Sequence, residues 1–481
     1  MNTEQLKQII EALAAEAAPL EVSKTDRSAW NRELLDYSER FLDQIQDLPA
    51  YDPVAKGSAV FDQIDFGENG RPIDAVLETL WQEVDRQGLN PASGGHLGYI
   101  PGGGIYPTAM GDFLAAITNR YAGIFFGGPG AVRLENQLIR WMCRLVGFPE
   151  TALGNLTSGG SIANLIALVT ARDVKGIKAV NIPKAVIYLT EQVHHCVQKA
   201  LRIGGLGEAV IRYVPMDERF RMDAGVLAQQ VAEDKQAGLR PLLVVGSAGT
   251  TDVGAIDPLD AIAEVAQAND LWFHIDAAYG GFFLLVDQLK DRFKGIERAD
   301  SVAIDPHKGL FLSYGLGAVL IKDVQAQYNT HYYRANYMQD AARMTEEYSP
   351  ADLSPELTKH FRGLRMWLSL ELFGLAPFRA CLAEKHALAH YFYYRIQELG
   401  FEVGPEPELS VVTYRYVPKQ GDADAFNDKL VQLVRQDGRV FVSSTQIAGQ
   451  FWIRLAVLSF RTHLWHIEHL LQLLGQASKD Q

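Results

Sequence analysis

The feature that most constrains the fold is a series of short apolar runs that alternate with helix-length segments between residue 151 and about residue 323. Such alternation predicts an α/β sheet whose strands are joined by crossovers. Ligands in open sheets of this kind bind beyond the carboxyl ends of the strands, so the residues after each run are candidate site residues. The predicted strands are Ala185–Thr190, Val210–Pro215, Leu242–Ala248, Leu271–Ala277, Ser301–Asp305 and Ala318–Lys322.

Composition narrows the class of protein. The 481 residues suffice for a large core in at least two lobes. The 58 acidic residues exceed the 45 basic ones, which argues against nucleic acid or an anionic membrane as a partner. The three cysteines form no CxxC motif, so neither a zinc site nor a disulfide framework is indicated, and a reducing cytoplasm is expected. We find no signal-peptide pattern and no apolar stretch long enough to span a bilayer.

Residues 1–50 are predicted to be helical, because apolar residues recur at helical spacing at Leu6, Ile9, Ile10 and Leu13. This stripe needs a partner surface, which either a second copy of the chain or the rest of the same subunit could supply. The glycine-rich residues 91–130 are predicted to form loops that approach a ligand closely. The loop aromatics and histidine there are either pocket residues or ordinary packing residues: His96, Tyr99 and Tyr106.

The segment Ser301–Leu310 places a lysine directly after a predicted buried strand. Pro306 ends strand pairing because proline has no N–H to donate. A lysine held between a proline and a glycine is typical of a fixed amine, and partly buried amines are suited to Schiff-base formation. Lys308 is therefore either a Schiff-base lysine or a surface lysine after a turn.

Other strand ends carry groups that suit a flat, anionic ligand. The segment Thr157–Ser161 opens a helix whose free N–H groups and dipole could bind a phosphate; a simple capped turn is the alternative. His194 follows the first predicted strand and could stack on an aromatic ring, although such a histidine can also be structural. Thr251 ends another strand, where its hydroxyl could bind a ligand or cap a turn.

Asp276 ends the strongly apolar run that begins at Leu271. A carboxylate there has to be paired, or it would become neutral. A protonated ring nitrogen is a suitable partner, and the small residues Ala277 and Ala278 leave room for a flat ring. Amine, stacking histidine, phosphate cradle and carboxylate together indicate pyridoxal 5′-phosphate as the cofactor.

At these residues the sequence resembles the group II pyridoxal-phosphate-dependent decarboxylases, which include aromatic-L-amino-acid, histidine, tyrosine and glutamate decarboxylases. The resemblance covers roughly residues 85–380 and is most specific in Asp305-Pro306-His307-Lys308 and in His274–Tyr279. It implies the α/β fold type I of aspartate aminotransferase, with a seven-stranded, mostly parallel sheet and a small C-terminal α+β domain. It also implies a homodimer with shared active sites.

The resemblance implies that the chain is divided into three parts. Residues 1–85 would form a helical arm at the dimer interface, residues 86–376 the large cofactor-binding domain, and residues 377–481 the small domain.

The resemblance also implies a role for each matching residue. Lys308 matches the lysine that binds the cofactor aldehyde, Asp276 the partner of the pyridine nitrogen, and His194 the stacking histidine. Ala278 matches the residue under the opposite ring face. The remaining implied cofactor contacts are Gly160, Ser161, Thr251, Ser301, Asp305 and His307. In the animal aromatic decarboxylases the residue at Asp305 is asparagine. Tyr99 and Ile100 match the segment that, in the family, reaches the substrate side of a neighbouring site across the dimer.

The implied reaction is the decarboxylation of an L-amino acid to the amine and CO2, by way of an external aldimine and a quinonoid. In the family a loop tyrosine, together with the lysine, returns the proton to Cα. Tyr348 is the first choice for that tyrosine, because it precedes Phe361–Trp367, which resembles the family's Phe-Arg-x-Leu-Lys-x-Trp. The same polar region also carries Tyr332, Tyr333 and Tyr337.

An aromatic substrate is expected from the overall resemblance and from the aromatic loops at Tyr99, Tyr106, Phe125 and Phe126. An acidic substrate is the alternative, because Arg133 could bind a second carboxylate. Arg454 and Arg461 could also bind a carboxylate, but we expect them to form salt bridges. An aldehyde synthase, an aminotransferase, a carbon–carbon lyase and a non-catalytic cofactor-binding protein stay open as other outcomes on this fold. A nicotinamide oxidoreductase is disfavoured, since no GxGxxG follows the first strand.

Overall fold

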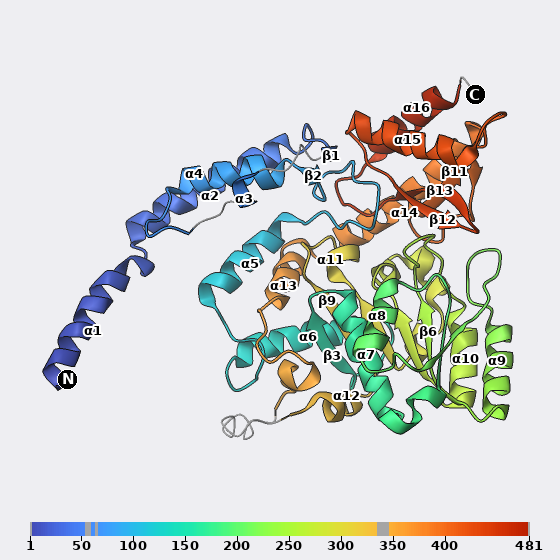
Figure 1. Ribbon diagram of the computed structural model, residues 1–481, viewed down its shortest axis with the longest axis horizontal. Helices are drawn as coiled ribbons and strands as arrows, with labels where there is room; N and C mark the ends of the chain where they lie inside the picture. Colours follow the sequence, from blue (N-terminus) through green and yellow to red (C-terminus); the bar gives the residue numbers. More distant parts are fainter. Residues whose placement is uncertain (1, 53–58, 63–65, 334–345, 480–481) are drawn as a thin grey trace. The chain divides into compact units, whose positions relative to one another are not determined.

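The computed structural model describes residues 2–52, 59–62, 66–333 and 346–479, and Figure 1 shows its helices and strands. The chain separates into two compact units, Met1–Asn90 and Pro91–Gln481. The three-part division at residues 85 and 376 stays a prediction.

The first unit is mostly helical and buries little surface. Its elements are α1 (Thr3–Ala17), α2 (Lys24–Gln44), α3 (Ala59–Asp62), α4 (Ile73–Leu80) and the antiparallel strands β1 (Tyr51–Asp52) and β2 (Gly88–Leu89). Asn2 and Gln5 cap each other's backbone N–H and so start α1, and the Ser23 hydroxyl caps α2. In the described chain no residue of α1, α2 or α4 is buried. Trp81 is one of the few buried side chains here, with the Arg40 guanidinium 4.2 Å from its ring centre.

The second unit contains the predicted sheet. Its seven strands are β3 (Leu153–Thr157), β4 (Ala185–Leu189), β5 (Val210–Tyr213), β6 (Arg240–Ser247), β7 (Trp272–Asp276), β8 (Ser301–Ile304) and β9 (Gly317–Ile321). They lie in the order β3-β9-β8-β7-β6-β4-β5, and the neighbouring pairs are parallel except for the two that involve β9. The expectation of a seven-stranded, mostly parallel sheet is therefore confirmed.

Both faces of this sheet are buried, which explains why its strands read as continuous apolar runs. Successive side chains of β4 enter opposite cores: Ile187 and Leu189 belong to one buried cluster, whereas Val186 and Tyr188 belong to the other.

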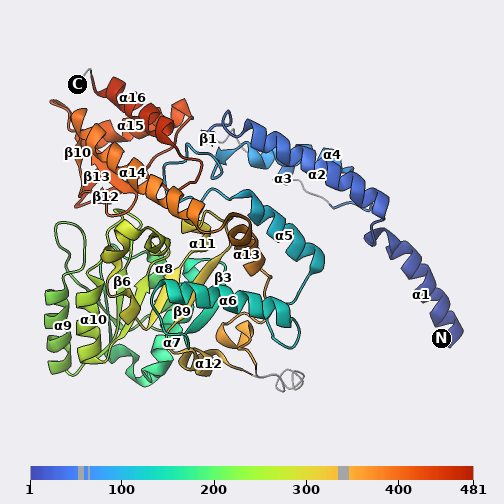
Figure 2. The ribbon, with the colours of Figure 1, turned by 180° about the vertical axis from the view of Figure 1, so that it is seen from behind.

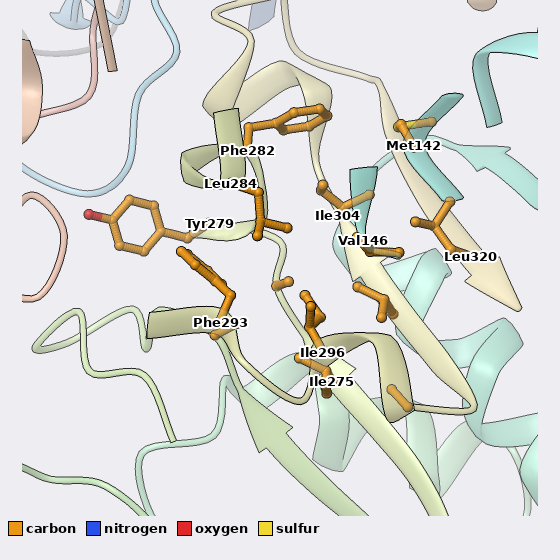
Figure 3. Packing of buried hydrophobic residues seen from close by; sticks show 14 of the residues in the cluster. Met142, Val146, Ile275, Tyr279, Phe282, Leu284, Phe293, Ile296, Ile304 and Leu320 are labelled. Carbon is orange, nitrogen blue, oxygen red and sulfur yellow. The ribbon is translucent and has the colours of Figure 1, made fainter. Parts of the chain in front are cut away.

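Helices cover both faces of the sheet (Figures 1 and 2). The core of one face includes side chains of α7 (Gly160–Val174) and α8 (His195–Ile203). The core of the other includes side chains of α6 (Pro129–Leu145), α9 (Ala224–Gln236) and α10 (Leu259–Asn269). Figure 3 shows part of this second core, where Met142 of α6 lies near Leu320 of β9. The unit also contains α5 (Tyr106–Thr118), α11 (Pro306–Gly309), α12 (Val324–His331) and α13 (Gly363–Phe373).

A smaller antiparallel sheet lies toward the C-terminus. Its strands are β10 (Glu402–Val403), β11 (Val411–Arg415), β12 (Ser443–Ile447) and β13 (Gln450–Ala456), in the order β10-β11-β13-β12. The helices α14 (Ala376–Glu398), α15 (Ala423–Asp437) and α16 (Leu464–Ser478) share a separate core with it.

In the part of the chain that the structure describes, no single helix has the length and apolar character needed to cross a membrane. The pair α13 and α14 meets that test only when taken together, and it is bent by 95°.

Candidate active site

A cavity of about 300 Å³ lies at the carboxyl end of the parallel strands of the large sheet. The predicted site residues that line it are Gly160, Ser161, His194, Thr251, Asp276, Ala278, Asp305, His307 and Lys308. The predicted site residues that do not line it are Tyr99, Ile100, Ser301 and Tyr348.

Strand ends bring these residues together. Asp276 is the last residue of β7, and Asp305 follows the last residue of β8. Pro306 then starts α11, a single helical turn that carries Lys308. Because β7 and β8 are parallel neighbours, their ends lie side by side and the carboxylate and the amine face one cavity.

Lys308 is only partly exposed and is held beside a buried carboxylate. Its Nζ lies 3.3 Å from Asp305 Oδ2, and the Asp305 side chain is 1% exposed. The other oxygen, Asp305 Oδ1, has no hydrogen-bond partner among the described residues. His307 is fixed by a 2.6 Å contact between its Nδ1 and the Leu316 carbonyl, and burial lowers the pKa of His307. Lys308 is therefore the cation closest to the Asp305 carboxylate.

The Asp276 carboxylate is oriented by two donors. Its Oδ1 accepts a hydrogen bond from the Ala278 N–H at 3.1 Å, and its Oδ2 accepts one from Asn164 Nδ2 at 3.3 Å. The carboxylate lies at the edge of the cavity, so a cationic ring nitrogen is the kind of group that could complete its pairing.

His194 is held in one tautomer at the start of α8. Its Nδ1 accepts a hydrogen bond from the Cys196 N–H at 3.3 Å, so this nitrogen carries no proton. Burial lowers the pKa of His194 below its ordinary value, with the Asp276 charge opposing the shift. The result is a neutral, flat ring at the cavity wall, as stacking on a cofactor ring requires.

The start of α7 forms the anion cradle. The Ser158–Ser161 segment lines the cavity, and α7 has no side-chain cap among the described residues, so its first N–H groups are free for a ligand. Gly159 has φ +155°, a region that only glycine adopts readily. A Cβ on Gly160 would lie 3.1 Å from Asp305 Oδ2 and 3.2 Å from Ala278 Cβ. The space that a side chain would fill is thus kept open, and the cradle fits a phosphate group.

Ser301 does not line the cavity, and its contact with the cofactor stays a prediction. Its Oγ is 2.8 Å from Trp272 Nε1 and 2.8 Å from His274 Nδ1, deep in the sheet. The physical reason is position along the strand: Ser301 is the first residue of β8, about 10 Å from the end at which the cavity lies.

Tyr348 does not line the cavity of its own chain, and its catalytic role stays a prediction. Its hydroxyl donates to Gln325 Oε1 at 3.1 Å, and its ring packs edge-on against Tyr328. Both partners belong to α12, the helix that follows β9. Because β9 runs antiparallel to β8, α12 starts at the edge of the sheet opposite the cavity. Tyr332 stacks on Tyr328, whereas Tyr337 lies outside the described residues.

Tyr99 and Ile100 have different surroundings. Tyr99 is 54% exposed, and its ring packs near His96 and Phe441. Ile100 is buried in the core of the large sheet. Their contribution to a neighbouring site across a dimer stays a prediction.

The three arginines considered as carboxylate clamps are engaged elsewhere. Arg133 pairs with Glu346 at 2.5 Å. Arg454 is almost fully buried and donates to backbone carbonyls, including that of Asp252 at 3.0 Å, so it ties β13 to the loop after β6. Arg461 donates to the carbonyls of Ala92 and Gly103.

Several cavity residues escaped the sequence interpretation. Asn164, Gln192, Cys196 and Tyr279 line the cavity beside the predicted set. The helical repeat could have indicated Asn164, which lies one turn after Gly160, but nothing in its sequence context marks a buried amide. Burial raises the pKa of Cys196 to about 12, so its thiol is protonated. No group of three or more potential metal ligands occurs among the described residues.

Comparison with known proteins agrees with this site. Residues 89–417 match the model of the pyridoxal-dependent decarboxylase conserved domain. An aromatic-L-amino-acid decarboxylase of Bacillus atrophaeus is 34% identical over 413 residues, 85% of each chain. A phenylacetaldehyde synthase of Petunia hybrida is 27% identical over 419 residues, 82% of this chain and 83% of its own.

Solved structures support the fold. The structure of Oryza sativa TDC with PLP and tryptamine superposes with a TM-score of 0.89 at 24% identity, over 95% of this chain and 99% of that one. This likeness confirms the predicted fold class. The extent of the family match and the identity to the Bacillus enzyme show that the chain belongs to the pyridoxal-dependent decarboxylase family and is a carboxy-lyase that uses pyridoxal 5′-phosphate.

Proposed function

We propose that this carboxy-lyase acts on an aromatic L-amino acid and releases the corresponding amine and CO2. The observation that carries the proposal is the gathering of Lys308, Asp276 and His194 around one cavity that also contains the open start of α7. The similarity to an aromatic-L-amino-acid decarboxylase supports an aromatic side chain on the substrate. The pairing of Arg133 with Glu346 weakens the argument for an acidic substrate.

Each cavity residue then has a distinct task. Bound pyridoxal phosphate supplies an electron sink for the electron pair that the departing carboxylate leaves on Cα. Lys308 Nζ would hold the cofactor through its aldehyde group. The Asp276 carboxylate would keep the pyridine nitrogen protonated, because an adjacent negative charge favours the cationic form of that nitrogen. His194 and Ala278 would hold the ring between them.

The start of α7 would hold the phosphate end of the cofactor. Gly160 and Ser161 contribute N–H groups at the positive end of the helix dipole, and the His307 side chain lies beside them. Thr251 and Asp305 are assigned as polar contacts to the cofactor. We assign the Lys308 amine, which lines this cavity, to hold the proton that Cα of the substrate receives.

We also propose a homodimer. In the first unit the stripe of α1 leaves Leu6, Ile9, Ile10 and Leu13 between 43% and 59% exposed. In the second unit α5 leaves a similar set exposed: Tyr106, Met110, Phe113, Leu114 and Ile117. Large apolar patches of this kind mark surfaces that bind protein, and a second copy would also bring the segment at Tyr99 and Ile100 to a neighbouring site. A cytoplasmic location is proposed because all three cysteines are free.

Aldehyde synthase activity is the second candidate, because the Petunia relative makes an aldehyde by name. An amino-acid panel tests both proposals: the purified protein with its cofactor is given aromatic and acidic amino acids, and CO2, amine, aldehyde, ammonia and keto acid are measured. We expect CO2 and amine in equal amounts from one or more aromatic substrates. Aldehyde and ammonia in place of amine would establish the synthase, and a preference for glutamate or aspartate would overturn the aromatic assignment.

A further inference from the structure

A buried row of polar side chains leads from the interior of the large sheet to Asp276. Ser301 Oγ lies 2.8 Å from Trp272 Nε1 and 2.8 Å from His274 Nδ1. His274 Nε2 lies 2.7 Å from Asn164 Oδ1, and Asn164 Nδ2 lies 3.3 Å from Asp276 Oδ2. His274, Ser301 and Asn164 are fully buried, so water does not replace these contacts.

The chemistry of the end groups fixes the direction of the Asn164 amide. Its Nδ2 lies 2.8 Å from the Gly160 carbonyl and 3.3 Å from the Asp276 carboxylate, and both of these oxygens accept only. The amide nitrogen must therefore face them, with the Cys196 sulfur as a weak third acceptor at 3.6 Å. The amide oxygen is left to face His274 Nε2, which has to donate.

The same reasoning fixes the tautomer of His274. Burial lowers the pKa of His274 to about 4, so the ring is neutral at physiological pH and has one N–H. That N–H is at Nε2, and Nδ1 must accept. Ser301 supplies the required O–H, because its own oxygen already accepts the N–H of Trp272, a side chain that can only donate. Every hydrogen in the row then has an acceptor.

Asn164 reaches both ends of the cofactor site at once. One of its N–H groups orients the carboxylate assigned to the pyridine nitrogen, and the other holds the carbonyl of the first residue of α7, the cradle assigned to the phosphate. Rotation of the amide by 180° would turn its oxygen toward a carboxylate and a carbonyl, which repel it. The Nε2–H of His274 adds to this preference, because it holds the amide oxygen on the side away from the carboxylate and the carbonyl.

We propose that His274 is a positioning residue that locks the Asn164 amide, and through it sets the Asp276 carboxylate and the start of α7 for the cofactor. This inference rests on the proposed role of Asp276 as the partner of the pyridine nitrogen. It gives Ser301 a role as well: the hydroxyl keeps His274 in the tautomer that donates toward Asn164.

Two substitutions of similar size separate positioning from packing. His274→Gln keeps an N–H donor near the position of Nε2, whereas His274→Leu keeps the apolar volume and removes the donor. The test measures the dissociation constant of pyridoxal phosphate by its visible absorption and the protonation of its ring nitrogen by ¹⁵N NMR with labelled cofactor. We expect His274→Leu to weaken binding about tenfold or more and to shift the nitrogen signal toward the neutral form. His274→Gln should stay within about threefold of the parent, with a cationic nitrogen.

Controls make each outcome decisive. Tyr188→Phe removes another buried hydroxyl, which donates to Asp234 at 2.9 Å and so joins β4 of the same sheet to α9, apart from this row; it should change neither readout. Ser301→Ala should have the same effect as His274→Leu but weaker. It replaces His274→Leu in the test if that variant does not fold. Equal behaviour of the Gln and Leu variants, or a cationic nitrogen in both His274→Leu and Ser301→Ala, would overturn the inference. Failure of the parent protein to bind the cofactor would instead refute the proposed function.

Discussion

Two helices of equal length, α1 and α7, show how differently fifteen residues can be used. α1 starts with a reciprocal cap made by Asn2 and Gln5, and in the described chain it buries none of its residues. α7 starts at Gly160 without a side-chain cap and buries seven residues, among them Asn164. α1 satisfies its own first N–H groups and leaves an apolar stripe for a partner. α7 draws its stability from packing and leaves its first N–H groups for a ligand. In this chain the open helix start lies at the candidate site, whereas the exposed apolar stripe of α1 is the proposed docking surface.

The largest effects are expected from substitutions of Lys308 and Asp276, which test whether the cavity at the start of α7 is a cofactor site. Lys308→Ala removes the amine that lines this cavity and should abolish the visible absorption of the bound cofactor, with turnover reduced by more than about a thousandfold. Asp276→Ala should keep the absorption, because the amine is intact, yet lose most of the turnover. Absorption spectra and CO2 release check both variants. Full activity of either one would contradict the assigned roles.

The next test closes the open start of α7. Gly159→Ala places a Cβ 3.2 Å from His307 Cε1 at φ +155°, so the first turn has to shift and the phosphate contacts weaken. We expect the dissociation constant of pyridoxal phosphate to rise roughly tenfold to a hundredfold, equivalent to about 1.4–3 kcal/mol. Asn2→Ala is the matched change at the start of α1: it removes a cap worth about 1 kcal/mol to that helix and should leave cofactor binding unchanged. Equal effects of the two variants would remove the distinction between the helices.

The apolar stripe of α1 can be tested in the same way. Ile10→Asp places a charge in the stripe and should raise the dissociation constant of the proposed dimer more than tenfold, because burial of one such side chain contributes about 1.5–3 kcal/mol per subunit. Gln8→Asp puts the same residue on the opposite face of α1 and should leave association intact. Sedimentation at several protein concentrations measures both. A dimer that is indifferent to Ile10→Asp would mean that the stripe docks elsewhere.

The sequence could predict most of the cavity, because Asp276, Asp305 and Lys308 each follow a continuous apolar run and strand ends converge in parallel sheets. It could not predict β3, in which Gly154 and Asn155 interrupt the strand pattern. Ser301 was expected at the site because it belongs to the same motif as Lys308, but it starts the strand that Asp305 follows.

Tertiary contacts between residues far apart in the chain could not be predicted from the sequence. The His274–Asn164 contact joins residues 110 positions apart, and the contact of Tyr348 with α12 depends on how the chain returns after β9. Neither leaves a periodic signal in the sequence.

The smallest expected effect is a pH dependence of the unfolding free energy, caused by His274, which contacts Asn164 of α7. The pKa of His274 is lowered to about 4, from an ordinary value near 6.5, so between these pH values the unfolded chain binds a proton that the native protein does not. The contribution of His274 to the unfolding free energy is therefore fully present above pH 6.5. It falls as the pH decreases, by at most about 1.4 kcal/mol per pH unit for this one group. His274→Gln lacks the titrating group, so its unfolding free energy should fall less steeply between pH 7 and pH 5. Denaturant unfolding at several pH values measures the difference in slope, and Tyr188→Phe should keep the parent slope because it leaves the histidine in place. Identical slopes in the parent and His274→Gln would mean that His274 does not stay neutral in the native protein, and the tautomer argument for Asn164 would fail with it.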